Sequence, residues 1–194
     1  MNIKIDIYLI MSLIILTIFK KLESFMIFYT FIMLHELIHI ITARELHIKV
    51  IEVSFLPFGV NAKFNFKNNK IKEIIVASAG PIFSLIMSIC FEYYKVENLF
   101  IFITNILPIY PLDGGRILKN IMKLVLGSNK GIKVYNSILK AAIIVLVIIN
   151  IILVVYLKNY KFIFVSLYIF QIAGEEIKKD KIRTQIVSTL NIEI

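Results

Sequence analysis

Apolar residues occur along this chain in long stretches, without the alternation of a surface strand or the spacing of an amphipathic helix. A helix needs about 20 apolar residues to cross a bilayer, and about 17 suffice without tilt. The second, third and fifth stretches reach that length, and the other three are shorter. We therefore predict six transmembrane helices, with four as the minimum. The stretches are Ile5–Phe19, Phe25–Ala43, Ile74–Phe91, Leu99–Leu112, Ala141–Leu157 and Phe162–Ala173.

The one sizeable break between these stretches, residues 45–73, has the composition of a β-hairpin. Its segments Ile48–Phe55 and Val60–Phe66 are rich in β-branched and aromatic residues. Leu56-Pro57-Phe58-Gly59 separates them with the Pro and Gly of a turn. We predict a hairpin at about residues 48–66. Its apolar tip favours a hairpin that dips into the membrane interface over a cytoplasmic surface loop.

The predicted fold class is therefore an all-α membrane protein, with about six transmembrane helices and a short membrane-associated β-hairpin between helices 2 and 3. We assign residues 1–173 to one membrane domain and residues 174–194 to a short cytoplasmic tail. A removable signal peptide is the alternative for the first stretch. Lys20 and Lys21 follow it directly, in place of a small-residue cleavage site, so we expect a retained helix.

Composition and charge support a membrane protein with a defined orientation. Hydrophobic residues make up 59% of the 194 residues, whereas soluble domains have about 45–50%. The net charge is +9. With a cytoplasmic N-terminus, 17 of the 22 basic residues lie on the cytoplasmic side, which is a strong positive-inside signal. We expect a multi-pass protein of the cell membrane with both termini cytoplasmic, contact with anionic lipid, and no nucleic-acid partner.

The second stretch contains His35-Glu36-Leu37-Ile38-His39, which fits the pattern H-E-x-x-H. Positions four apart return to the same face of a helix, so both imidazoles can bind one zinc ion. Glu36 is rotated off that face and can reach a water molecule at the metal instead. A single such histidine would more simply be a hydrogen-bonded core residue. Ionisable groups at membrane depth are costly and usually functional, so the trio predicts a site for one zinc ion per chain.

Two histidines do not complete a catalytic zinc site, which normally has three protein ligands and an open position. Asp113 is the candidate third ligand, because Asp6 begins the first stretch and Asp180 lies in the tail. Asp113 ends the fourth stretch, in the string Asn105-Ile-Leu-Pro-Ile-Tyr-Pro-Leu-Asp-Gly-Gly-Arg116. Its two prolines interrupt a helix there. The alternative for Asp113 is a solvated residue in a helix-ending turn at the interface.

The predicted topology separates these two interpretations of Asp113. The second helix runs inward and places His35 and His39 in its cytoplasmic third. The fourth helix also runs inward and places Asp113 at its cytoplasmic end. The histidines and the carboxylate therefore reach a similar depth, which favours a shared site near the cytoplasmic side.

Taken together, these motifs resemble those of the site-2 proteases, a family of intramembrane zinc metalloproteases. The resemblance covers about residues 5–173 and is greatest to the sporulation members, which process a membrane-associated sigma-factor precursor. The paired HELIH and Asn105–Asp113 motifs, the hairpin and Ala79-Gly80-Pro81 carry it. Three residues after that proline, where the family often has Asn, this chain has Ser84.

This resemblance implies hydrolysis of a peptide bond in or near a membrane segment of a substrate protein. Zinc held by His35, His39 and Asp113 would activate water, and Glu36 would act as the general base. The resemblance further implies that Asn105 orients the substrate or stabilises the oxyanion. The implied partners are a membrane-associated substrate protein, such as a sigma-factor precursor in sporulation, and membrane proteins that inhibit the enzyme.

Two other functions remain open at this stage. A membrane metal carrier, or an inactive relative that only binds a partner, would share the histidines. A carrier should show metal ligands along a path, whereas here they form one cluster and Glu36 is left over for catalysis. A protease for soluble substrates that is merely tethered to the bilayer is the weaker alternative.

Overall fold

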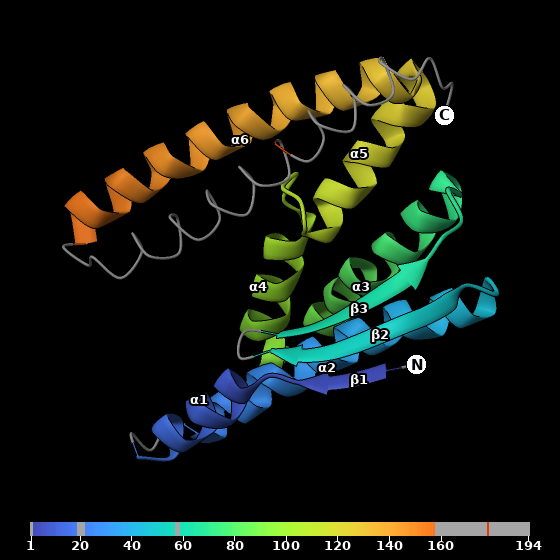
Figure 1. Cartoon of the computed structure of the whole chain (residues 1–194). Helices are drawn as coiled ribbons and strands as arrows, with labels where there is room; N and C mark the ends of the chain where they lie inside the picture. Colours follow the sequence, from blue (N-terminus) through green and yellow to red (C-terminus); the bar gives the residue numbers. More distant parts are fainter. Residues whose placement is uncertain (1, 19–21, 57–58, 158–177, 179–194) are drawn as a thin grey trace. The chain divides into compact units, whose positions relative to one another are not determined.

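The computed structural model describes residues 2–18, 22–56, 59–157 and 178, and Figure 1 shows its helices and strands. The chain divides into two compact units, Met1–Asn105 and Ile106–Ile194. The elements in chain order are β1 (Asn2–Ile5), α1 (Ile7–Ile18), α2 (Leu22–Glu45), β2 (Lys49–Leu56), β3 (Gly59–Asn65), α3 (Lys70–Cys90), a 3-10 turn (Glu92–Tyr94), α4 (Lys95–Ile106), α5 (Asp113–Leu126) and α6 (Ser128–Leu157).

Three helices in the described part of the chain are long and apolar enough to cross a membrane. They are formed by Phe25–Glu45 of α2, Lys70–Cys90 of α3 and Ser128–Ile149 of α6. They contain the second apolar stretch, all of the third except Phe91, and residues 141–149 of the fifth. Helices α1 and α4 have 12 residues each, which is short of the length that spans a bilayer. The sixth stretch lies outside the described residues, so the count of six helices stays a prediction.

The predicted hairpin is present between α2 and α3. Strands β2 and β3 pair antiparallel from Lys49↔Asn65 to Leu56↔Gly59, within one residue of the predicted ends. His47 terminates α2 ahead of the hairpin, with a positive φ of 56°. The N–H of Ile48 then donates to the carbonyl of Ala43 at 2.8 Å, which turns the chain into β2. Whether the hairpin dips into the membrane interface stays a prediction.

The N-terminal residues differ from the sequence prediction. Residues 2–5 form strand β1, which pairs parallel with β2 in the order β1-β2-β3. The first helix therefore begins at Ile7, not at Ile5. Asp6 makes the transition: its N–H donates to the carbonyl of Phe55 at 3.0 Å, and its Oδ1 accepts from the N–H of Tyr8 at 2.9 Å. A carboxylate in this N-cap position satisfies a helix donor and starts α1.

The sheet has one apolar face and one polar face. Val50, Val53 and Ala62 are buried on the apolar face, and Ile40 of α2 packs against them. Figure 1 shows the strands running alongside α2. Because successive side chains of a strand point to opposite faces, this packing fixes the hairpin register relative to α2. The same register places the backbone N–H of Ala62, on β3, at the side chain of Glu36.

On the polar face, Glu52 of β2 links the two flanking strands. It lies 2.7 Å from Lys4 Nζ on β1 and 3.1 Å from Lys63 Nζ on β3. The hydroxyl of Ser54 also donates to Glu52, at 3.0 Å. These hydrogen bonds, that of Lys4 first and that of Lys63 next, lower the pKa of Glu52 to about 2. A charged Glu52 therefore joins all three strands.

Helix α4 ends at Ile106, and a separate helix, α5, begins at Asp113 in the second unit. Pro108 and Pro111 occupy the gap between α4 and α5, as the sequence predicts. The prediction that Asp113 sits at the end of the fourth helix is wrong, because Asp113 is the first residue of α5. A Cβ on Gly114 would come within 2.6 Å of the Leu107 carbonyl oxygen. The helix therefore resumes here because the glycine lets its first turn lie against the preceding loop.

Helix α5 then packs against α6. The buried core of this unit consists of Ile109, Tyr135, Leu139 and Ile143. The hydroxyl of Tyr135 accepts a hydrogen bond from the N–H of Tyr110 at 3.1 Å. This bond anchors the proline-containing loop that leads into Asp113.

The Glu52 cluster predicts a pH dependence for the pairing of β1. The pKa of Glu52 lies below its ordinary 4.5, so its contribution is complete above about pH 4.5 and is lost as pH falls towards about 2. We expect the hydrogen-exchange protection of the β1 amides to be constant from neutral pH to about 4.5 and to fall below it. Glu52→Gln should lower the protection at neutral pH and remove this dependence. An unchanged pH profile in the variant would contradict the assignment.

Candidate metal centre

Helix α2 brings His35 and His39 together on one face, one turn apart, as their spacing predicts. Both side chains are buried, with 4% and 2% of their surface exposed. Their Nε2 atoms lie 3.2 Å apart. Burial of two imidazoles in a membrane-length helix is costly unless their nitrogens have hydrogen-bond partners or a bound metal ion.

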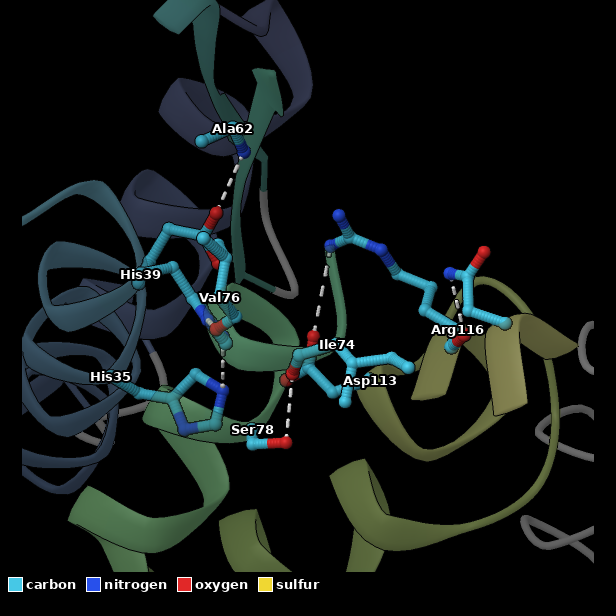
Figure 2. Close-up of polar contacts among 10 residues, drawn as sticks. His35, His39, Ala62, Ile74, Val76, Ser78, Asp113 and Arg116 are labelled. Atoms are coloured by element: carbon cyan, nitrogen blue, oxygen red, sulfur yellow. Dashed lines mark hydrogen bonds and ion pairs between the residues drawn. The ribbon is translucent and has the colours of Figure 1, made fainter. Parts of the chain in front are cut away.

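Helix α3 holds the other nitrogen of each ring. His39 Nδ1 lies 2.6 Å from the carbonyl oxygen of Val76. A carbonyl only accepts hydrogen bonds, so His39 Nδ1 carries the proton and its Nε2 keeps a lone pair. His35 Nδ1 lies 2.8 Å from the hydroxyl of Ser84, which is fully buried. Figure 2 shows both histidines and Val76. Contacts of this kind orient metal-binding histidines and fix their tautomers.

The geometry of this pair fits a zinc ion. Two nitrogens about 2.0–2.1 Å from a tetrahedral zinc ion lie roughly 3.3 Å apart, close to the observed 3.2 Å. The hydrogen bonds at Nδ1 leave both Nε2 atoms directed to one point. In neutral rings with Nδ1 protonated, two lone pairs would face each other there, and a shared cation removes that repulsion. The two histidines therefore have the spacing and orientation of two ligands of one metal ion.

Gly80 permits the close approach of α3 to the histidines. A Cβ built on Gly80 would lie 2.6 Å from His35 Nε2 and 2.6 Å from His39 Cε1. Real Cβ atoms essentially never approach so closely. Val76, Gly80 and Ser84 recur every four residues and so share one face of α3. Along that face, the Val76 carbonyl contacts His39, Gly80 leaves room for both rings, and the Ser84 hydroxyl contacts His35.

Glu36 points away from the imidazole face, as the motif predicts, and reaches the sheet. Its Oε1 accepts a hydrogen bond of 2.8 Å from the backbone N–H of Ala62 on β3. Figure 2 shows this bond at Ala62. The side chain is half-buried. The carboxylate next to His35 in the sequence is thus in contact with a strand of the hairpin.

The other two predicted site residues lie further along the chain. Asn105 is the last residue of the first unit and is half-buried, with its Nδ2 donating to the carbonyl of Ile101 at 3.0 Å. Asp113 belongs to the second unit, is 6% exposed, and has Arg116 Nη1 3.8 Å from its Oδ1. Its place in the first turn of α5 suits a carboxylate, because helix N-termini favour negative charge.

The roles of three residues around the histidines could not be predicted from the sequence. Ser84 stood out only as a departure from a family pattern, and nothing in the sequence indicated the contacts of Val76 and Ala62, because both act through backbone atoms. Gly80 had a visible signal in the small-residue string Ala79-Gly80-Pro81. A glycine inside a membrane helix is typical of close helix packing.

Comparisons with known proteins identify the family of the chain. The sequence profile described as peptidase family M50 matches residues 24–95 and 90–149, more than half of the chain. A zinc metalloprotease of Methanocaldococcus jannaschii is 26% identical over 177 residues, covering 82% of this chain and 51% of that protein. Stage IV sporulation protein FB of Bacillus subtilis is 32% identical over 103 residues, covering 45% of this chain and 36% of that protein.

A solved structure is also similar. The site-2 protease from Methanocaldococcus jannaschii superposes with a TM-score of 0.62 at 26% identity, covering 90% of each chain. The present chain spans about half the length of the first curated relative and about a third of the second.

Removal of the Ser84 hydroxyl should weaken metal binding. Losing the group that orients a metal-binding histidine typically costs about 10–100-fold in affinity, and we expect Ser84→Ala to fall in that range. Competition with a chelator of known zinc affinity measures it in detergent-solubilised protein. Ser88→Ala is the matched control, because the Ser88 hydroxyl bonds the Leu85 carbonyl on the same helix. Equal affinities for both variants would rule out the orienting role.

A methyl group on Gly80 should force α3 away from the histidines. We expect Gly80→Ala to lose bound zinc and to be destabilised by about 1–3 kcal/mol, the usual cost of overpacking. Metal content by mass spectrometry and thermal unfolding measure the two effects. Ile82→Ala, at an exposed position of the same helix, should change neither by much. Full zinc content in Gly80→Ala would show that the close approach is not required.

Proposed function

We propose that this chain, which belongs to peptidase family M50, is an intramembrane zinc metallopeptidase. It would hydrolyse a peptide bond in or near a membrane segment of a substrate protein. The observation that carries the proposal is the buried pair of Nε2 atoms 3.2 Å apart, on a helix of membrane-spanning length, beside Glu36. The family membership and the similar proteases support the reaction class.

We propose Asp113 as the third zinc ligand. It is buried, and like the two histidines it offers an atom that can bind a metal ion. Two imidazoles and one carboxylate form a common ligand set of catalytic zinc sites, which leave one position open. When bound there, zinc polarises the scissile carbonyl and lowers the pKa of water towards about 7.

The chain's own residues would supply the proton transfers and the positioning. Glu36 takes the proton from the attacking water and delivers it to the leaving amine, which requires its carboxylate to move between the two. Asn105 would orient the substrate or stabilise the oxyanion through the second hydrogen of its amide, since one hydrogen is held by Ile101. Such a donor typically contributes about 2.7–4 kcal/mol.

The hairpin would hold the scissile segment extended. A substrate helix hides its carbonyls in hydrogen bonds, so the segment must unwind before attack. Strand β3 pairs only with β2 among the described residues and lies against α2. An extended segment could add to its outer edge as a further strand. This position would place the segment beside the helix that carries Glu36.

For the biological substrate, we propose a membrane-associated protein, with a sigma-factor precursor as the first candidate. The similarity to a protein named for stage IV of sporulation supports this choice. The protein would be multi-pass in the cell membrane, with cytoplasmic termini and an active site near the cytoplasmic side. The charge distribution of the sequence supports that orientation. Inhibitory membrane partners belong to the same proposal.

The alternative function is a metal carrier or an inactive relative. Such a protein needs the histidines but has no use for a carboxylate beside them. The contact of Glu36 with the hairpin favours the peptidase, because it links that carboxylate to the strand that we propose binds the substrate.

Glu36→Gln separates the two functions. For a peptidase, this change should lower cleavage of a co-expressed sigma-factor precursor by at least about 10²-fold, the usual contribution of a general base. Zinc content should stay the same, because the ligands are intact. Glu45→Gln, an exposed position at the end of the same helix, is the control and should cleave normally. Unchanged cleavage by Glu36→Gln would remove Glu36 as the base.

A further inference from the structure

The outer edge of β3 presents the N–H groups of alternate residues. The carbonyl of Phe55 accepts from Asp6, the residue directly after β1. The peptide groups of Phe55 and Val53 therefore face β1, and those of Ser54 face β3. Ser54 pairs with Asn61 and Val53 with Ala62. Asn61 therefore bonds β2, and Ala62 directs its N–H away from the sheet. By the same alternation, Val60 does so too.

Glu36 accepts a hydrogen bond from one of these outward N–H groups. Its Oε1 accepts from the Ala62 N–H at 2.8 Å, which is the length of a strong, charge-assisted bond. Ala62 is held in place from the other side, because its side chain is 6% exposed and packs with Val53 and Ile40. The position of the Ala62 N–H relative to α2 is thus fixed by the core of the sheet. At this N–H, the Glu36 carboxylate of α2 is the acceptor, where the backbone carbonyl of a neighbouring strand would otherwise be.

We propose that Glu36 gates the outer edge of β3. In the substrate-free protein its carboxylate binds the Ala62 N–H. A substrate segment that adds to this edge takes the same N–H for one of its carbonyls, and Glu36 is released for proton transfer. Arrival of the extended segment and availability of the base are then one event. This inference rests on the proposed peptidase function and on strand addition at β3.

The gate follows from a conflict between two uses of one donor. A single N–H in line with an acceptor makes one strong hydrogen bond. A strand paired across Val60 and Ala62 needs the N–H groups of both residues. Glu36 must therefore leave Ala62 when the strand forms. The side chain that leaves belongs to the residue directly after His35 in the sequence, so the base that is released is the one that the motif predicts.

Hydrogen exchange tests the resting contact without any cleavage. The zinc-loaded protein in detergent, labelled at alanine and valine amides, is compared with Glu36→Ala. We expect the Ala62 amide to exchange about tenfold faster in the variant, because a hydrogen bond to a charged group is lost. The Val60 amide, on the same edge without this contact, should change by less than about twofold. Equal protection of Ala62 in both proteins would overturn the proposal.

Kinetics on the cleaved precursor test the competition itself. Ala62→Pro removes the N–H that Glu36 and the substrate share, and Val60→Pro removes the neighbouring outward N–H. Proline is tolerated on an edge strand. For a gate, Val60→Pro raises KM by about tenfold, because it removes a donor that only the substrate uses. Ala62→Pro raises KM less, because it also removes the competing contact with Glu36. Both variants keep kcat within about twofold of wild type.

Two other kinetic outcomes overturn the gate. A kcat that falls about tenfold or more in Ala62→Pro alone would mean that Ala62 positions Glu36 for catalysis. An unchanged KM in both proline variants would mean that no strand adds to this edge. If the chain cleaves no substrate, the peptidase proposal fails, whereas the hydrogen-exchange result still decides the Glu36–Ala62 contact. If Ala62→Pro does not fold, the exchange comparison in Glu36→Ala likewise decides that contact.

Discussion

The close contact of α3 with α2 at Gly80 is the constraint on which the rest of the site depends. Only without a side chain at that position do the Val76 carbonyl and the Ser84 hydroxyl come within hydrogen-bonding distance of the two rings. Those bonds orient the two rings so that both Nε2 atoms face one point. A membrane offers little hydrophobic driving force for association of two helices. The contact is therefore stabilised by packing of small residues and by these polar bonds.

The hairpin is coupled to the same pair of helices. Its length is set by the turn at His47 and the start of α3, and its face is set by the burial of Ala62 against Ile40. A shift of the strand by one residue would turn the apolar face away from α2 and move the Ala62 N–H to the other edge. The packing that buries the sheet therefore also determines which backbone donor meets Glu36.

Much of the fold and the chemistry could be predicted from the sequence because both rest on local patterns. Apolar length located the three membrane-length helices, and Pro57 with Gly59 located the hairpin turn. The spacing of His35 and His39 predicted their common face. Strand β1 was missed because Ile3 and Ile5 pair with residues some 50 positions away. The start of α5 at Asp113 was missed because its glycines resemble a helix end, although here they permit close backbone packing.

Backbone contacts set the limit of such prediction. The Val76 carbonyl and the Ala62 N–H act through atoms that every residue has, so their roles depend on three-dimensional placement alone. For Asp113 and Asn105, by contrast, the side chains themselves indicate a chemical role. Their residue types suggest the chemistry, and their participation stays a proposal.

The parallel pairing of β1 with β2 has a consequence for how the protein assembles. Ile5 meets Phe55 only after both α1 and α2 have been synthesised, so the sheet cannot close before α2 is complete. Closing a loop of this length carries an entropic cost that local helix formation does not. Helix α2, which carries the two histidines, can therefore form early in biogenesis, whereas the complete sheet beside it forms late.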